Sequence, residues 1–292
     1  MLLHKFWIDE TRSLCTHDGA TKRFRFKIGS DISQADAEEK AEALFRAAEA
    51  FLQRADPTPD EVREFRDELR LIQGCEDESG EYQKPICEEI LLEIDSNNVV
   101  TRNHYGAEVL NSTDTCFIDV DNVRWSFLRI LKNLFASYGI GEWAMEVATC
   151  LASKPEHADL GFRVYRTAAG ARVIVIGNGL DPGSERMRRL FQAFNADPRY
   201  AALCDVQRCF RARLTPKPSR MHRKPRLGKA VPFPYATESD RQEANAWIEV
   251  YNDRSEHYAV CRFLKAFGRP INDRIVDFHD EATGADTGRQ LA

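Results

Sequence analysis

The chain has 292 residues, of which 30% are charged and 43% hydrophobic, so it suits one large folded domain or two ordinary ones. No window approaches the ~18 apolar residues of a membrane span, and the first residues lack the apolar core of a secretory signal. We therefore predict a cytoplasmic protein without a membrane partner. Eight cysteines occur without a Cys-x-x-Cys pair, which disfavours structural zinc; only Cys204 and Cys209, with His222, come near that pattern.

The first third of the chain is predicted to alternate between strands and helices. Strands are expected at residues 3–8 and 22–28. Helices are expected at residues 35–52 and 59–72, where apolar side chains recur at helical spacing. We interpret residues 1–85 as a support module that carries no visible chemistry.

From Thr115 onward the predicted order of elements is β-α-β-β-α-β, the order of the ferredoxin-like unit. These elements are a strand at 115–120, helices at 123–135 and 142–152, hairpin strands at 162–167 and 171–176, helices at 182–194 and 198–203, and a strand at 206–214. We predict an α+β fold with an RRM-like palm over residues 86–236. A C-terminal extension at 237–279 would pack on the palm, and the polar residues 280–292 would form a disordered tail.

Asp119 and Asp121 end the apolar run CFIDVDN and are one residue apart. Residues two apart on a strand point to the same face, so both carboxylates would project side by side. Adjacent carboxylates repel each other unless a cation or basic side chains share the site. Oxygen ligands suit Mg²⁺ or Mn²⁺, so we predict that this pair is catalytic and binds one of these metals. The alternative left open is a salt-bridge network with Arg172, Arg211 or Arg213.

A basic segment runs through an otherwise acidic chain of net charge −5, and there is no Asp or Glu between Val206 and Thr237. Its cationic residues are Arg208, Arg211, Arg213, Lys217, Arg220, Arg223, Lys224, Arg226 and Lys229. Such a block points to phosphate, nucleic acid or an acidic partner. The alternative is a solvated loop without function.

The expected sheet would place several of these side chains beside the two carboxylates, on a face left open by the helices. Arg163 and Tyr165 share one face of the first hairpin strand, where a tyrosine can stack on a base, although a half-buried aromatic is the commoner explanation. The predicted nucleotide- or phosphate-binding residues are Arg163, Tyr165, Arg166, Arg172, Arg211, Arg213 and Lys217. His104 and Tyr105 are interpreted as parts of a structural turn around Gly106.

The run IDVDN and the later hairpin FRVYRTAAGARVIVI resemble the palm of archaeo-eukaryotic-type primases, over about a third of the chain at residues 115–214. This resemblance implies metal binding by Asp119 and Asp121. The chain departs from the family pattern twice: Arg172 is closest to the family's histidine, and the expected strand CFRARLTPKPSR has arginines where a third acid should stand. The segments TRNHYGAEVLN, YRTAAGAR and FRARLTPKP are similar to an uncharacterised bacterial family.

These observations favour divalent-metal-dependent binding of a nucleotide or nucleic acid, with nucleotidyl transfer as a candidate activity. The alternative is a non-catalytic nucleic-acid or protein-interaction module that uses the basic residues 206–229. A metal-dependent glycosyltransferase is disfavoured, because no nucleotide-binding βαβ unit precedes the Asp-x-Asp motif.

Overall fold

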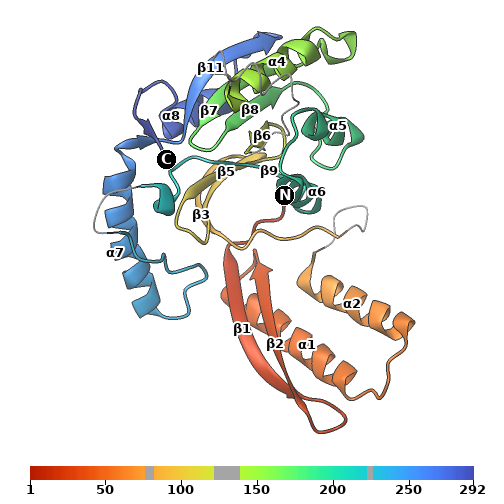
Figure 1. The fold of residues 1–292 in the computed structure, drawn as a ribbon. Helices are drawn as coiled ribbons and strands as arrows, with labels where there is room; N and C mark the ends of the chain where they lie inside the picture. Colours follow the sequence, from red (N-terminus) through yellow and green to blue (C-terminus); the bar gives the residue numbers. More distant parts are fainter. Residues whose placement is uncertain (76–81, 122–138, 222–225) are drawn as a thin grey trace. The chain divides into compact units, whose positions relative to one another are not determined.

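The computed structural model describes residues 1–75, 82–121, 139–221 and 226–292 (Figure 1). The protein is a mixed α+β protein with several antiparallel sheets. It divides into two compact units. Unit 1 comprises Met1–Glu89 and Phe233–Glu238, and unit 2 comprises Ile90–Pro232 and Ser239–Ala292. In the described part of the chain no helix combines the length and the apolar character needed to cross a bilayer.

Unit 1 is a long β-hairpin packed against a helix pair. Its elements are β1 (Phe6–Cys15), β2 (Thr21–Ser30), α1 (Gln34–Leu52) and α2 (Pro59–Gln73). Both predicted helices are confirmed, because local signals fix their starts: Ser33 caps α1, and Thr58 forms a capping box with Glu61 before α2. Both strands are longer than predicted. The parts of β1 and β2 nearest the hairpin turn carry many charged side chains, so the apolar pattern of the sequence did not mark them as strand.

Unit 2 contains two four-stranded sheets. The first has the order β11 (Cys261–Gly268), β7 (Gly161–Thr167), β8 (Ala171–Ile176), β6 (Cys116–Val120). The second has the order β3 (Glu89–Asp95), β4 (Asn98–Arg102), β5 (Glu108–Ser112), β9 (Phe210–Arg213). The remaining elements are α4 (Ile140–Ala152), η1 (Pro155–His157), α5 (Glu185–Ala193), α6 (Pro198–Gln207), η2 (Pro218–Arg220), α7 (Glu238–Ser255), β10 (Tyr258–Ala259), α8 (Arg274–Thr283) and β12 (Gln290–Leu291).

The predicted hairpin is confirmed as β7 and β8, and β8 pairs with β6 as the expected topology requires. In the expected ferredoxin-like sheet the fourth strand flanks the first, which is β6 here, but β9 pairs with β5 in the second sheet. The Tyr200 hydroxyl lies between β6 and β9: it donates to the Phe117 carbonyl at 2.6 Å and accepts from the Arg211 N–H at 3.2 Å. A side chain thus bridges the two strands where the prediction expected a backbone ladder. The predicted helix at 123–135 lies outside the described residues.

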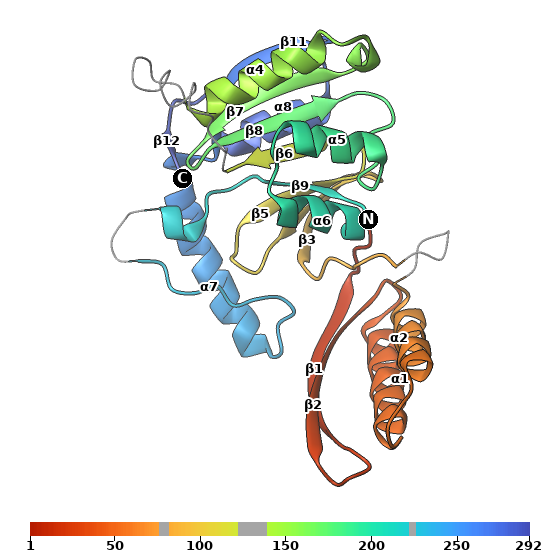
Figure 2. The same ribbon diagram turned by 45° about the vertical axis from the view of Figure 1, so that its right-hand side comes forward.

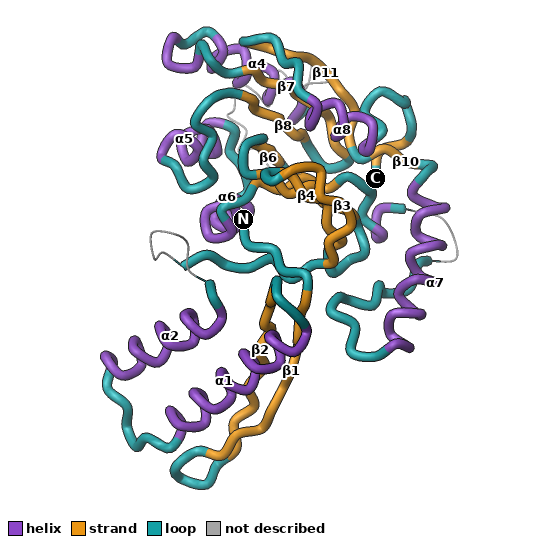
Figure 3. Tube along the Cα trace, turned by 180° about the vertical axis from the view of Figure 1, so that it is seen from behind, coloured by secondary structure: helices purple, strands orange, loops and turns teal. Residues whose placement is uncertain are grey.

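Helices cover both faces of the first sheet. Figure 2 shows α4 and α5 in front of it and α8 behind it, and in the reverse view of Figure 3 α8 lies in front. The prediction of an open face was wrong, because α8 presents Ile275, Val276 and His279 to the sheet as buried side chains. Asp273 starts this helix by accepting the N–H groups of Ile275 and Val276.

The predicted disordered tail was also wrong. Helix α8 continues through Thr283, and Gly284 ends it in the left-handed conformation at φ 66°. Strand β12 then pairs with β10, and Ala292 is buried with its N–H on the Ala259 carbonyl at 3.0 Å. The preceding residues give the first sheet its edge strand β11, so the C-terminal region completes the sheet. The polar composition of the tail suggested disorder. The contacts that order it join residues far apart in the sequence, so the local composition does not reveal them.

Candidate functional site

Asp119 forms a paired contact with Arg172, its direct neighbour across β6 and β8. Arg172 Nε donates to Asp119 Oδ1 at 2.8 Å and Nη2 donates to Oδ2 at 3.3 Å. Burial would raise the pKa of Asp119, but the Arg172 guanidinium outweighs it and lowers that pKa below the usual range. The alternative interpretation of the sequence, an ion pair between Asp119 and a nearby arginine, therefore describes this contact.

A buried polar network extends from this pair to α8. Arg172 is fully buried, and its Nη1 donates to the Arg213 carbonyl at 2.9 Å and to His279 Nε2 at 3.2 Å. The other ring nitrogen of His279 contacts Asp280 Oδ1 at 2.9 Å. Burial lowers the pKa of His279 to about 4, and the adjacent Arg172 acts in the same direction, so its ring is neutral near pH 7.

The hairpin residues predicted to bind phosphate or a base belong largely to the same network. Arg163 pairs with Asp280 and donates from Nε to the Tyr165 hydroxyl at 2.8 Å. Tyr165 is fully buried and packs edge-on against His279, so its ring offers no face to a base. Arg166 lies apart from this network and pairs with Glu142 of α4 at 2.6 Å. The network attaches α8 to the sheet and uses the very side chains that the sequence suggested for a ligand.

The residues near Asp119 do not fit the predicted site for Mg²⁺ or Mn²⁺. Both carboxylate oxygens of Asp119 are bound by a buried guanidinium, so a metal would have to displace Arg172. Asp121 follows β6 and is exposed. Among the residues that the structure describes, no group of three or more His, Cys, Asp or Glu side chains is placed to hold a metal. Asp119 is thus a carboxylate neutralised by Arg172, whereas Asp121 is a solvent-exposed carboxylate.

Basic residues of β9 and of the segment that follows it lie near these carboxylates. Burial lowers the pKa of Arg213, and Arg172 lowers it further. The pKa of Lys217 is lowered by burial and then by Arg213 and Arg220. Arg211 is half-buried, and its main-chain N–H and carbonyl contact the Tyr200 hydroxyl. Three of the predicted phosphate-binding residues thus lie in one basic region, with Lys217 at its outer end.

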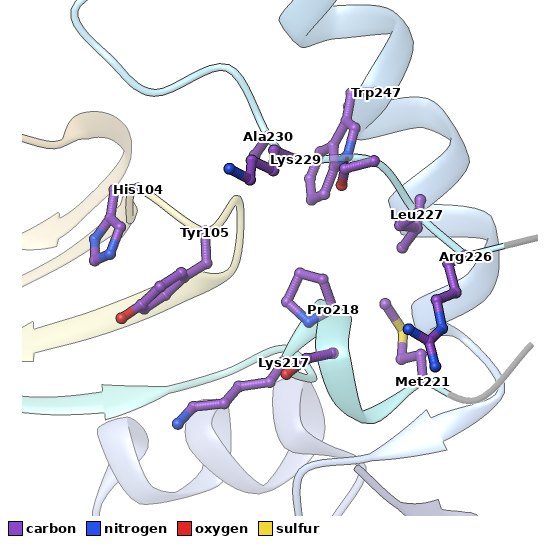
Figure 4. A pocket seen from close by; sticks show the side chains of 12 residues that line it. His104, Tyr105, Lys217, Pro218, Met221, Arg226, Leu227, Lys229, Ala230 and Trp247 are labelled. Atoms are coloured by element: carbon purple, nitrogen blue, oxygen red, sulfur yellow. Dashed lines mark hydrogen bonds between the residues drawn. The ribbon is translucent and has the colours of Figure 1, made fainter.

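A pocket of about 930 Å³ opens beside Lys217 (Figure 4). Its lining residues come from the β4–β5 turn, the basic segment and α7: His104, Tyr105, Lys217, Pro218, Ser219, Met221, Arg226, Leu227, Gly228, Lys229, Ala230 and Trp247. In Figure 4 Trp247 and Lys229 face Pro218 across the opening, with Tyr105 at one end and Arg226 at the other. These lining residues include cations and aromatic rings and no carboxylate.

The turn before β5 holds Tyr105 at the pocket. Asn103 Oδ1 accepts the N–H groups of Tyr105 and Ala107, at 3.0 and 3.2 Å, and this fixes the turn. Gly106 has φ 84°, and a Cβ there would lie 2.2 Å from the Trp247 ring. The close approach of this glycine lets the turn and α7 meet. Tyr105 is 51% exposed, and its ring lies 3.7 Å between centroids from the ring of His104, so the exposed part of the ring is available to a ligand.

Trp247 is held in place from several sides. Its Nε1 donates to the Gly228 carbonyl at 2.9 Å, which also fixes the basic segment. Its ring stacks on Tyr251 at 5.0 Å between centroids, and the Tyr251 hydroxyl donates to the Pro216 carbonyl at 2.7 Å. The sequence marked the basic segment but not Trp247. The signal that could have been used was an aromatic residue on the helix that follows an acid-free stretch.

Comparison of the chain with protein-family models, with curated proteins and with solved structures found no match.

Proposed function

We propose that the pocket beside Lys217 binds single-stranded nucleic acid or a nucleotide. The observation that carries this proposal is the composition of the lining, which combines lysine, arginine and aromatic side chains without a carboxylate. Cationic side chains neutralise phosphates, and exposed aromatic rings stack on bases. The net charge of the whole chain is −5, whereas the lining of the pocket is cationic. A bound polyanion would neutralise this local positive charge.

The dimensions and the preformed walls of the pocket support the same proposal. A volume of about 930 Å³ lies at the upper end of the range for small-molecule sites and accommodates a nucleotide or a short stretch of strand. The walls are set by the Asn103 turn and by the anchored ring of Trp247. A preformed site loses less conformational entropy when it binds a ligand.

The primase-like palm remains a proposal for the relation of this fold to known ones. The antiparallel order β6–β8–β7, with α4 and α5 on one face, supports it. The proposed binding does not involve a metal at Asp119, because Arg172 already occupies that carboxylate. Binding without nucleotidyl transfer is the function that this geometry supports best.

The test is fluorescence anisotropy with a labelled 12-nucleotide single strand, as RNA and as DNA, at several salt concentrations. The variant Lys217→Gln/Lys229→Gln should weaken binding at least tenfold and flatten the dependence on salt, by about one counterion for each lysine that contacts a phosphate. Lys154→Gln is the matched control, because Lys154 is exposed and lies outside the pocket. Absence of binding by the wild type at low salt would overturn the proposal.

The contribution of stacking is tested with Tyr105→Leu. Stacking of one base is worth about 1–3 kcal/mol, so this variant should lose fivefold or more in affinity. Tyr82→Leu replaces a tyrosine of unit 1 that is 39% exposed and should leave affinity unchanged. Binding that depends on the lysines but not on Tyr105 would instead indicate a site for another polyanion, such as an acidic protein.

A further inference from the structure

A second group of cations continues inward from the pocket. It consists of Arg213 at the end of β9, Lys217, and Arg220 in η2, whose N–H donates to the Lys217 carbonyl at 2.9 Å. Figure 4 shows the Lys217 side chain leading away from Trp247. The charges are near enough to act on one another, since Arg213 and Arg220 both lower the pKa of Lys217. Lys217 therefore belongs both to the pocket and to this group, which we call the inner cation cluster.

The inner cation cluster has little counter-charge of its own. Among the described residues, no carboxylate forms an ion pair with the side chain of Arg213, Lys217 or Arg220. Asp119 and Asp121 both act on Arg213 and Lys217, but Asp119 is already paired with Arg172, so Asp121 is the carboxylate of the two that remains to offset the cluster. Within the described part of the chain, the three cations of the cluster and this one carboxylate leave an excess of two positive charges. A phosphomonoester carries about −1.5 to −2 at pH 7, which matches this excess.

Arg213 adds an unsatisfied donor. Its Nη1 is buried and has no hydrogen-bond acceptor among the residues that the structure describes. A buried donor without a partner is unfavourable, and more so when the donor is charged. An anion that binds beside Arg213 would supply the missing acceptor for this donor. The Arg213 side chain is also partly buried. A terminal phosphate of a nucleic-acid strand reaches such a cation more easily than an internal phosphodiester does, because an internal phosphodiester has a nucleoside on either side.

We propose that the inner cation cluster binds a terminal phosphomonoester of the strand or nucleotide whose bases occupy the pocket. This inference rests on the proposed function and deepens it, because it makes a phosphorylated end the preferred ligand. Lys217 connects the two parts: its stem lines the pocket, and its ammonium group lies among the inner cations. Planar guanidinium groups then take the phosphate oxygens through charge-assisted hydrogen bonds.

The experiment compares one 12-nucleotide strand in three forms: 5′-phosphorylated, 3′-phosphorylated and without a terminal phosphate. Each form competes with a labelled unphosphorylated strand at constant salt and at pH 7.5. The wild type should prefer one of the two phosphorylated ends about tenfold, as charge-assisted hydrogen bonds of ordinary strength require. The variants Arg220→Gln and Arg213→Gln should lose this preference, whereas Lys154→Gln should keep it.

The outcomes separate this inference from the proposed function. Equal affinity for all three forms, with binding intact, overturns the terminal-phosphate site and leaves the nucleic-acid pocket standing. A preference that survives in Arg220→Gln and Arg213→Gln overturns the placement of the site. Failure of the wild type to bind any form overturns both. Circular dichroism of each variant establishes that a lost preference comes from the altered charge in a folded protein.

Discussion

The buried pair of Asp119 and Arg172 leads to a stability prediction that distinguishes a structural arginine from a ligand-binding one. Arg172→Met keeps the length and the apolar stem of the side chain but removes the guanidinium. The change leaves Asp119, the Arg213 carbonyl and His279 Nε2 without the donor that serves all three. A phosphate-binding arginine on an open face would not donate to several buried protein acceptors, so its replacement would cost little stability.

The magnitude follows from the burial of the pair. Removal of one partner from a buried ion pair costs about 3–5 kcal/mol, because the other charge stays in a poorly solvated place. Arg172 is fully buried while Asp119 keeps 28% of its side chain exposed, so water screens the remaining carboxylate partly. We therefore expect a loss of about 3 kcal/mol, at the low end of that range.

The matched control is Arg186→Met. Arg186 makes the same paired contact, with Asp159 at 2.6 and 3.1 Å, but the side chains are 29% and 32% exposed. Pairs of this kind contribute about 0–1 kcal/mol, so the control should lose about 1 kcal/mol or less. The assay is urea unfolding at pH 7.5, followed by far-ultraviolet circular dichroism, with the slope against urea compared among variants.

A third variant, Asp119→Asn/Arg172→Met, removes the stranded charge as well. It should recover at least 1 kcal/mol relative to Arg172→Met, because an amide is easier to bury than a carboxylate. The reasoning is refuted if Arg172→Met loses no more than Arg186→Met. It is also refuted if the double variant is less stable than Arg172→Met. In either case the guanidinium would be open to an external anion, as the sequence suggested.

Three further predictions concern single residues. The pKa of His279 in the folded protein, about 4, lies below its unfolded value of about 6.5, so the unfolded chain binds more protons between these values. The free energy of unfolding should therefore be constant above pH ~6.5 and fall by up to about 3 kcal/mol toward pH ~4. Urea unfolding across this range tests it, and an equal decline in His279→Asn would contradict it. Gly106→Ala places a Cβ 2.2 Å from the Trp247 ring at φ 84°, so it should lower stability by about 1–2 kcal/mol and weaken strand binding. Unfolding and anisotropy measurements on this variant would refute the role of the glycine if both stay at wild-type values. Tyr200→Phe removes the hydroxyl that bridges β6 and β9 and should cost about 1–3 kcal/mol in urea unfolding. A loss below about 0.5 kcal/mol would mean that the bridge contributes little.

The local elements of the fold were predictable because their signals are short-range. The capping box at Thr58, the hairpin turn before Gly170 and the alternation along β7 and β8 are all written within a few residues. The same alternation placed Arg163 and Tyr165 correctly on one face. The sequence could not show what covers that face, since α8 begins about a hundred residues after β7. The polar composition around the end of α8 is typical of a disordered C-terminal segment.

The candidate site divides in the same way. The sequence by itself determined that the basic segment at 206–229 has no compensating acids, because charge is a property of composition. Only the tertiary structure decided which cations stay open to a ligand. Contacts of Arg172 with His279 and of Arg163 with Asp280, 107 and 117 residues apart, enclose one group of arginines. The approach of the Gly106 turn to Trp247, in contrast, builds a pocket beside Lys217. The physical reason is that burial and pairing depend on which distant segments share a surface, and the local pattern of a strand carries no record of that.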